Sequence, residues 1–412
     1  MWREEAFHHL RRSIQATQRT SLFTGYFISW DEKNRCATPL GKGWHYRTFQ
    51  IFALFSILIT IPIIVAKLLQ LWTLSGEVDK SERMEILTEI IFTFLQLGYF
   101  LISLPMWWYF FLPSGPRRFV TVYHALLNLE AKLEDMVSRG TFTARRAVID
   151  TKTTRRMSTL ATLFFLCIDY VIPWFCMGIA CSPYNAMTSL VEASHFLSSR
   201  NLLFARILIS LGTTIAATMA ASIVAIILLI FVYGIMSLYL WTLFIIPAAR
   251  SGISFDSGVK IYRALKVMTV IKGDFARDVV GPRMHHIFAV VWATIALYFL
   301  MTQVIVTANV SIFVVLLCAT MIFISGWVEW FAIGLVAMGA TLSKTFIREM
   351  ARIHGRKKIR RRVMGSLLPN FINLEFVTSV KTMQEGIEMG YFANFMERVT
   401  NNTINLLLAR SV

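Results

Sequence analysis

The sequence has few charged residues. Asp, Glu, Lys and Arg make up 16% of its 412 residues, against about 25% in soluble globular chains. Hydrophobic residues make up 56% of the chain, and the mean hydropathy is +0.59. Such a composition is not typical of soluble proteins. It predicts a protein that lies in a membrane.

Motifs of enzymes and metal proteins are also missing. The five cysteines show neither metal-ligand spacing nor a disulfide framework, although Cys181 is a candidate for a disulfide. The sequence contains no phosphate-binding loop, nucleotide fingerprint or nucleophile motif. The first 45 residues are polar, which argues against a cleaved signal peptide. We therefore expect no enzymatic activity, no cofactor and no metal site.

Six long apolar stretches stand out instead. A bilayer core about 30 Å thick is crossed by a helix of about 20 apolar residues. The stretches of that length with few or no charges are 46–74, 86–112, 157–180, 202–249, 287–308 and 312–342. Apolar runs in the core helices of soluble proteins rarely exceed about 14 residues. Six such runs therefore predict six transmembrane helices.

Basic residues alternate with these stretches. Of the 41 Lys and Arg residues, 33 fall in the segments 1–47, 113–156, 250–283 and 344–362. The intervening segments hold few, and the one at 77–85 is acidic. Lys and Arg accumulate in cytoplasmic loops. The amino terminus and all four basic segments are therefore expected in the cytoplasm, with small loops outside.

The formal net charge of +17 has two interpretations. Basic clusters bind nucleic acid in many proteins. Here they flank apolar helices, where the anionic lipid of the inner leaflet attracts them. The densest run is 356–362, with the sequence RKKIRRR. We expect it to act at the membrane surface or in cytoplasmic assembly, and we expect no nucleic-acid partner.

Two of the apolar stretches are too long for one membrane crossing. The stretch 202–249 would form a helix of about 72 Å, more than twice the thickness of the hydrocarbon core. The sixth stretch continues past Leu342 as a charged, helix-favouring segment to about Arg352. A tight hairpin within 202–249 is the alternative, but Gly212 and Gly234 lie in no clear turn sequence. We expect one span that continues into the cytoplasm and packs there with other extended helices.

The last stretch, 386–408, carries a polar stripe. Its polar residues fall at helical spacing on one face: Asn394, Glu397, Arg398, Asn401 and Asn405. The opposite face carries apolar residues such as Phe395 and Val399. Two interpretations remain open. The stretch is either a spanning helix that lines a pore or an amphipathic helix on the cytoplasmic membrane surface.

With the last stretch as a span, the fold class is an all-α polytopic membrane protein of seven transmembrane helices. The amino terminus is then cytoplasmic and the carboxyl terminus extracellular. Its parts are a cytoplasmic segment, 1–45; a six-helix bundle with cytoplasmic extensions of the fourth and sixth helices, 46–342; a basic loop and short helix, 343–383; and the last helix, 384–412.

This arrangement resembles the insect gustatory and odorant receptor superfamily, with its nematode relatives, the gustatory-like and serpentine class r receptors. The best motif of that superfamily, at the end of its last helix, is Thr-Tyr, five mostly apolar residues and Gln. Residues 403–410, TINLLLAR, match its Thr and most of its apolar run. Ile404 replaces the Tyr and Arg410 the Gln. The sequence GYF at 390–392 is similar to the Gly-x-Phe opening of that helix.

The resemblance implies a chemosensory receptor in the plasma membrane. It implies a homo- or heterotetramer that works as a ligand-gated, non-selective cation channel. The last helix of each subunit would line the pore, and the cytoplasmic ends of helices four to seven would form the main contact between subunits. A small organic ligand would bind in the outer half of each subunit.

Two other functions were weighed against the channel. A G-protein-coupled receptor would carry Asp-Arg-Tyr after the third helix and Asn-Pro-x-x-Tyr in the last, and both are absent. The expected orientation argues against it as well. A transporter commonly has internal repeats and broken helices, and the sequence contains no repeat. The channel remains the leading hypothesis.

Charged residues within the apolar stretches are candidate functional groups, because such charges are costly in a bilayer. Asp169 lies midway along the third stretch and Glu329 midway along the sixth. Lys67 and Arg206 are their possible partners. The interpretations are structural ion pairing, or a role in gating or ligand binding. The paired histidines at 285–286 are interpreted as solvated.

Aromatic and polar residues in the expected outer half suggest a ligand pocket, because such pockets are mostly apolar with a few polar groups. The candidate ligand-binding residues are Phe92, Gln96, Tyr170, Trp174, Phe204, Tyr298 and Gln303. Ordinary packing between helices is the alternative for each of them.

Overall fold

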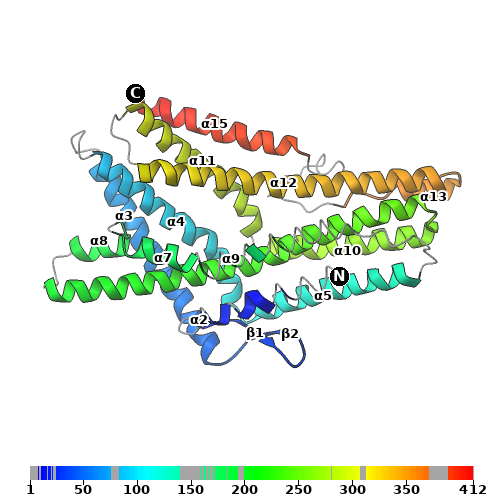
Figure 1. Cartoon of the computed structure of the whole chain (residues 1–412), viewed down its shortest axis with the longest axis horizontal. Helices are drawn as coiled ribbons and strands as arrows, with labels where there is room; N and C mark the ends of the chain where they lie inside the picture. Colours follow the sequence, from blue (N-terminus) through cyan, green and yellow to red (C-terminus); the bar gives the residue numbers. More distant parts are fainter. Residues whose placement is uncertain are drawn as a thin grey trace. The chain divides into compact units, whose positions relative to one another are not determined.

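A computed structural model gives the arrangement of most of the chain (Figure 1). The structure describes residues 8, 11–15, 17–19, 21, 25–75, 83–139, 159, 162–163, 166, 170, 172–182, 184–193, 199–279, 281–306, 312–370 and 388–411. Two sequence predictions lie outside these residues. They are the position of Asp169 and the short helix expected near 371–383.

Helices dominate the described residues, labelled as in Figure 1. In chain order the elements are β1 (Ile28–Asp31), β2 (Cys36–Pro39), α2 (Trp44–Phe55), the π-helix η1 (Ser56–Thr60), α3 (Ile61–Leu74), α4 (Arg83–Phe111), α5 (Ser114–Arg139), α7 (Ile172–Ala180), α8 (Ala186–Ala193), α9 (Ser199–Arg250), α10 (Phe255–Val279), α11 (Gly281–Val306), α12 (Ile312–His354), α13 (Lys358–Gly365) and α15 (Gly390–Ser411).

Five helical segments of the described chain are long and apolar enough to cross a membrane. They are Trp44–Leu74, Glu85–Phe111, Asn201–Ile227, Tyr233–Arg250 and Cys318–His354. A shorter apolar helix covers His286–Thr302. This fits the expected all-α membrane protein.

Helix α9 is continuous over 52 residues, about 78 Å at 1.5 Å per residue. The hairpin considered for 202–249 is therefore excluded, and two of the five apolar segments lie in this one helix. Helix α12 continues over 43 residues to His354, which confirms the extension expected beyond Leu342. Both helices are longer than a bilayer core is thick.

The chain divides into two compact units. The first consists of 1–123 and 155–230, and the second of 124–154 and 231–412. The boundaries fall within α5 and α9, so each of these helices contributes to both units. The two units are described separately below.

In the first unit, a π-turn interrupts the first apolar helix. The Ile61 N–H donates to the Ser56 carbonyl, five residues back, in place of the usual four. Pro62 follows directly, and a proline ring clashes with the carbonyl four residues before it while offering no N–H. The wider turn accommodates that clash, so that α2, η1 and α3 form one rod.

A short β-hairpin precedes this rod, within the segment 1–45. Strands β1 and β2 pair antiparallel, from Ile28 opposite Pro39 to Asp31 opposite Cys36. The Asp31 carboxylate accepts hydrogen bonds from the backbone N–H groups of Lys33 and Asn34 and so stabilises the turn. Strands were not expected in an all-α protein. The side chain of Asp31 provides local turn chemistry that hydropathy does not detect.

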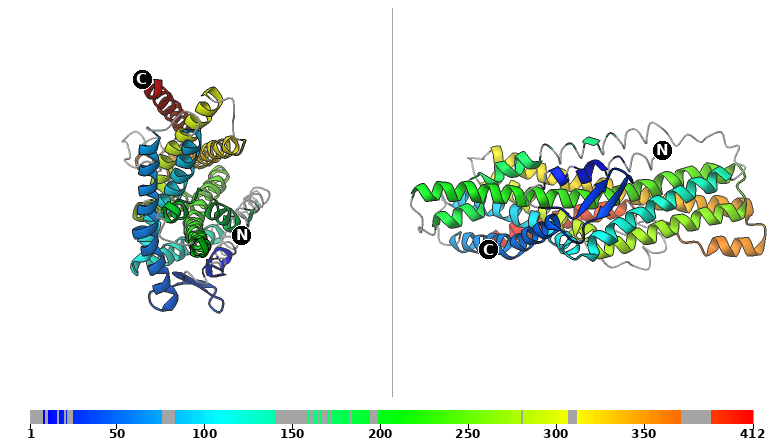
Figure 2. Two further views of the ribbon diagram at one scale, coloured as in Figure 1. Left: turned by 90° about the vertical axis from the view of Figure 1, so that its left-hand side faces the viewer. Right: turned by 90° about the horizontal axis from the view of Figure 1, so that it is seen from below.

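In the second unit, two helices occupy segments that were predicted only as basic and cytoplasmic. Helix α10 runs along the distal half of α9, and the last part of α5 joins them (Figures 1 and 2). The buried residues of α10 recur every three or four positions, as in Ile261, Leu265, Met268 and Lys272. The expected packing of the extended helix with other helices is therefore present within this unit.

Helices α11, α12, α13 and α15 are the other described helices of the second unit (Figure 1). Helix α15 runs parallel to α11. Tyr391, at its start, lies near His286, and Thr403, farther along, lies near Thr294. Helix α15 therefore lies along an apolar helix of this unit.

Candidate functional site

The apolar face of α15 is anchored to α11. Phe395 and Val399 are buried against Ala289 and Ala293. The Thr403 hydroxyl, one turn further on, donates to the backbone carbonyls of Val399 and Thr294. Small side chains spaced four residues apart let two helices approach closely within a membrane. The alanines of α11 therefore form a groove that receives one face of α15.

The polar stripe of α15 lies on the other side of the helix. Its five side chains are all exposed in the single chain: Asn394, Glu397, Arg398, Asn401 and Asn405. Phe395 and Val399 of the predicted apolar face contact α11, whereas the apolar side chains of Met396 and Leu406 are exposed like the polar residues. The polar groups are therefore exposed on the surface of this chain.

A histidine and a carboxylate connect α11, α12 and α15. The Nδ1 atom of His286 lies 3.1 Å from Oε2 of Glu329, and both side chains are largely buried, with 13% and 3% exposed. The His286 ring also lies 5.3 Å from the Tyr391 ring and 5.8 Å from that of Phe395, both on α15. The interpretation of His286 as solvated is wrong, because this residue faces two neighbouring helices.

The ion pairs of the other charged residues in the apolar stretches also differ from the prediction. Lys67 pairs with Glu89 of α4, at 3.0 Å. Arg206 pairs with Glu192 of α8, at 2.7 Å. Structural pairing of Lys67 and Arg206 is therefore observed, but each partner comes from a neighbouring helix that was not considered.

Two of the predicted ligand-binding residues converge on α8. Phe92 is buried and stacks on Tyr184, with ring centroids 4.8 Å apart. The Gln96 side chain donates to the Tyr184 carbonyl at 3.1 Å and accepts from the Ala186 N–H at 3.5 Å. These two residues fix the start of α8 against α4.

The remaining predicted ligand-binding residues do not join this group. Tyr170, Trp174 and Phe204 of the first unit have exposed side chains. Tyr298 belongs to the second unit and packs edge-on against Phe299. Gln303 lies in α11 of the same unit. The structure therefore does not gather the seven residues into one pocket within either unit.

Sequence reasoning missed a buried polar cluster in the second unit. Glu130 of α5 accepts hydrogen bonds from Tyr233 and Ser237 of α9. Lys272 of α10 donates to the backbone carbonyl of Gly234. Glu130 and Lys272 are only 2% and 1% exposed. The cluster therefore joins three helices through charged and hydroxyl side chains.

Burial changes the acidity of both charged groups in this cluster. It raises the pKa of Glu130, against the hydrogen bonds from Ser237 and Tyr233 and the charge of Lys272, which lower it. Burial lowers the pKa of Lys272 to about 7, against the opposing effect of Glu130. The sequence offered one signal, since the positions of Lys272 and Met268 on α10 follow the buried helical period.

A second polar cluster joins α10 and α12. The Tyr262 hydroxyl bonds to the Ser343 hydroxyl at 2.7 Å and donates to the Leu368 carbonyl at 2.7 Å. The Asn370 N–H donates to the Ser343 oxygen. Burial raises the pKa of Tyr262 to about 12. These bonds hold the segment after α13 against α10 and α12.

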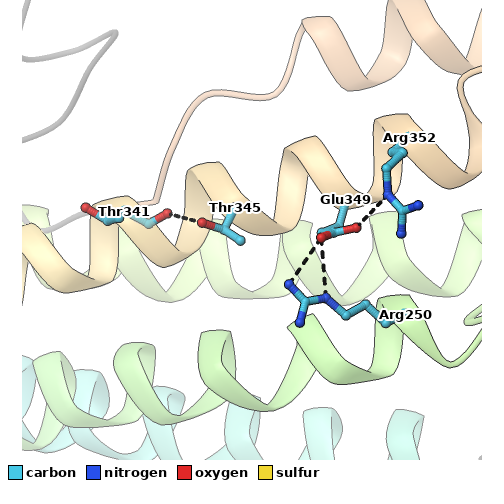
Figure 3. Close-up of polar contacts among 5 residues, drawn as sticks. All are labelled: Arg250, Thr341, Thr345, Glu349 and Arg352. Carbon is cyan, nitrogen blue, oxygen red and sulfur yellow. Dashed lines mark hydrogen bonds and ion pairs between the residues drawn. The ribbon is translucent and has the colours of Figure 1, made fainter.

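At the far end of the long helices, an ion-pair group connects α9 to α12 (Figure 3). Glu349 accepts from Arg250 at 3.2 Å and from Arg352 at 3.0 Å. Near it on α12, the Thr345 hydroxyl donates to the Thr341 carbonyl. Two arginines, Arg250 and Arg352, contact the single carboxylate of Glu349 here. The basic run 356–362 follows shortly after in the chain.

Metal binding finds no support in the described part of the chain. No group of three or more His, Cys, Asp or Glu side chains there could hold a metal ion. The cysteines Cys36, Cys176, Cys181 and Cys318 are free thiols, so the disulfide considered for Cys181 with any of these three is not formed.

Comparison with known proteins adds no assignment. No model of a known protein family matches the chain, and no curated protein sequence matches it.

Proposed function

We propose that the protein is a chemosensory receptor of the plasma membrane that works as a ligand-gated, non-selective cation channel. A small organic ligand opens it, and the last helix, α15, lines the pore. The observation that carries the proposal is the division of α15 into two faces. Its apolar face packs into the groove of α11, and its polar face stays exposed.

The polar face is costly unless it meets water. Moving one charged side chain to the centre of a bilayer costs about 2.5–3.5 kcal/mol even on insertion scales. Glu397 and Arg398 are two such groups, and three asparagines accompany them. A ring of subunits that directs these faces toward a common axis would place them in a water-filled pore, which removes this cost.

The parallel packing of α15 along α11 supports a spanning helix over a helix on the membrane surface. The apolar part of α11 covers His286–Thr302, and the contacts of α15 run along this part from His286 to Thr294. A surface helix would cross a spanning helix at its end. Helix α15 follows α11 for about two turns instead.

Seven spans follow when α11, α15 and the segment 157–180 are added to the four long apolar helices α2–α3, α4, α9 and α12. An amino terminus in the cytoplasm and a carboxyl terminus outside agree with the alternation of basic segments. With this orientation, α9 and α12 extend into the cytoplasm.

The basic run of α13 then has an assembly role rather than a lipid-binding one. Helix α12 measures about 64 Å, so its end lies about 30 Å beyond a hydrocarbon core of about 30 Å. Electrostatic attraction to lipid is screened over about 8 Å at physiological salt. Arg356 to Arg362 are therefore too far from the inner leaflet and suit contacts between cytoplasmic ends.

Current recordings test the pore. Glu397→Gln removes a negative charge from the proposed lining, so the reversal potential in a salt gradient should shift toward that of anions. Glu388→Gln is the matched control, because Glu388 precedes α15 and contacts Lys344 at 3.7 Å. Equal reversal potentials in both variants and the wild type would argue against α15 as the pore lining.

The side of the carboxyl terminus tests the topology. An epitope tag after Val412 should be accessible to antibody outside intact cells, whereas a tag before Met1 should become accessible only after permeabilisation. A carboxyl-terminal tag found only in the cytoplasm would leave six spans and overturn the pore helix.

A further inference from the structure

A small cavity lies within the first unit, between the first apolar rod, α8 and α9. Its volume is about 180 Å³. Its wall includes Phe55, Thr60, Met187, Leu208, Gly212 and Thr213. None of these side chains is charged, and two of them carry a hydroxyl group. This cavity is not formed by the residues that the sequence suggested for ligand binding.

Gly212 shows that packing does not account for this space. A Cβ atom added to Gly212 would meet no atom within 4 Å. Glycine in the middle of a helix costs about 0.5–1 kcal/mol relative to alanine, and Gly212 lies well inside α9. No neighbouring atom requires the absence of its side chain. What the glycine provides is the open volume itself.

The π-turn contributes the opposite wall. Thr60 is the last residue of η1, and Phe55 directly precedes η1. Turns of this kind are uncommon in helices and are frequent at functional sites. Here Pro62 explains why the turn forms, and the turn places Thr60 at the cavity.

The surroundings of the cavity are apolar on the outside as well. Leu208, at its edge, is 51% exposed, and Leu211 and Leu58 nearby in the chain are more exposed still. All three lie in segments apolar enough to span a membrane. A molecule that reaches the cavity along this surface passes through hydrocarbon and must itself be apolar and uncharged.

The hydroxyl of Thr213 adds one polar requirement. Its only hydrogen bond found among the described residues is to the Sδ atom of Met187, at 3.9 Å, and a thioether is a weak acceptor. An oxygen atom of a ligand would be a better partner. An apolar cavity of about 150 Å³ holds a molecule the size of benzene. The volume and chemistry therefore limit the occupant to about six to ten heavy atoms.

We propose that this cavity binds a small, uncharged, mostly hydrocarbon molecule that carries one oxygen, such as a medium-chain alcohol or ketone. As a binding site it stands on its own geometry. As the site from which the ligand opens the channel, it rests on the proposed function.

Photolabelling of the full-length protein in lipid nanodiscs tests the site. The probe is a six-carbon alcohol in which one chain carbon belongs to a diazirine ring, and the labelled residues are mapped by mass spectrometry. Labels are expected on α9 near 208–213 and on α8 near Met187, with loss of the label in excess octanol. Labels spread evenly over exposed apolar faces, with no competition by octanol, would overturn the proposal.

Two variants separate filling of the cavity from general effects. Gly212→Leu places a side chain in the space and should reduce labelling at least tenfold. Gly178→Leu is the matched control, because a Cβ at this other helical glycine also meets nothing within 4 Å, and it should label like the wild type. Unchanged labelling in a folded Gly212→Leu protein would overturn the proposal.

Thr213→Val keeps the shape and removes the hydroxyl, so it also covers the case in which Gly212→Leu fails to fold. It should reduce labelling by the alcohol about tenfold and leave labelling by an equivalent hydrocarbon diazirine unchanged. An equal effect on both probes would contradict the polar requirement.

A lipid probe and current recordings identify what fills the cavity and whether filling it opens the channel. A phospholipid with a diazirine in its acyl chain should label the cavity more weakly than the alcohol, and stronger labelling would overturn the proposal in favour of bilayer lipid. Specific labelling without any current would refute the channel and leave the site intact. Currents opened by octanol with no cavity label would refute the site and leave the channel intact.

Discussion

Helix α9 contains two interior glycines whose surroundings differ completely. In the first unit, a Cβ at Gly212 would meet nothing within 4 Å, and the space beside it is a cavity. In the second unit, a Cβ at Gly234 would lie 2.7 Å from Cδ of Lys272, which crosses α9 at this point and donates to the Gly234 carbonyl. One glycine leaves space open, and the other makes room for a buried cation.

This difference separates two uses of the same residue. At Gly234 the missing side chain serves packing, since it lets α10 place an ammonium group against the α9 backbone. At Gly212 the missing side chain makes room for no contact among the described atoms, and the space beside it is empty. The binding function that we propose therefore depends on the space beside Gly212, whereas Gly234 makes room for Lys272.

The largest expected effect is removal of the cation beside Gly234. At pH 6, below its pKa of about 7, Lys272 is charged in the folded protein. There Lys272→Met leaves Glu130 buried without this neighbouring positive charge, and removing one charge of a buried pair costs about 3–5 kcal/mol. The thermal unfolding midpoint of the purified protein should fall by roughly 5 °C. Adding Glu130→Gln to Lys272→Met should restore most of the loss. An unchanged midpoint in the single variant would show that the pair does not stabilise the fold.

Gly234→Ala should destabilise the protein by about 2–3 kcal/mol. Alanine gains about 1 kcal/mol in helix propensity, but its Cβ collides with Lys272 and forces the ammonium away from its carbonyl partner. The same thermal unfolding assay measures the change. In the background of Lys272→Met, the substitution should instead become neutral or stabilising. Destabilisation of equal size in both backgrounds would contradict the role given to Gly234.

The stability of the protein should also depend on pH through Lys272. The pKa of Lys272 is lowered from 10.5 to about 7 in the folded protein, so between these values the unfolded chain binds one proton more. Stability should therefore rise as the pH rises from 7 toward 10. Glu130 has the opposite effect. Because its pKa is raised in the folded protein, the stability that it contributes is lost as the pH rises above 4.5. The increase above pH 7 should be absent in Lys272→Met, and an equal increase in both proteins would exclude Lys272 as its source.

A smaller effect is expected from the hydroxyl groups around Glu130. Ser237→Ala removes one hydrogen bond to the buried carboxylate, and a bond to a charged group contributes about 1.5–3 kcal/mol. Thermal unfolding should report a loss in this range, below that of Lys272→Met. Ser257→Ala is a control, because its hydroxyl contact with Ser254 is exposed. A loss in the control as large as that in Ser237→Ala would contradict the argument.

The continuity of α9 could be predicted from the sequence, whereas the role of its glycines could not. An apolar run without an early proline or turn sequence predicts one long helix, and neither Gly212 nor Gly234 breaks it. What each glycine faces depends on another helix far away in sequence. Hydropathy carries no information about that neighbour.

The polar stripe of α15 could be predicted from helical spacing. The helix against which α15 packs could not. Helical spacing alone divides polar from apolar positions, and in the structure Phe395 and Val399 of the apolar side pack against α11. The choice of α11, with its small side chains at Ala289 and Ala293, depends on tertiary packing. The sequence predicted the face but not the surface that covers it.

Ion pairs were the least predictable feature. Lys67 and Arg206 were assigned to distant carboxylates, and both bind acidic residues at the ends of adjacent helices, Glu89 and Glu192. Counting basic residues by segment likewise treated Lys272 only as one basic residue of a cytoplasmic segment. A count gives the side of the membrane, but burial of a single lysine depends on the neighbouring helices that enclose it.

The smallest expected effect returns to the open space at Gly212. Gly212→Ala should stabilise the protein by about 0.5–1 kcal/mol, because alanine loses less backbone entropy in a helix and its Cβ meets nothing within 4 Å. The unfolding midpoint should rise by about 1 °C, opposite in sign to Gly234→Ala. A single methyl group fills little of a cavity of about 180 Å³, so photolabelling should persist in Gly212→Ala and disappear in Gly212→Leu. Destabilisation by alanine would mean that a neighbouring side chain closes onto Gly212, and the contrast between the two glycines would then be lost.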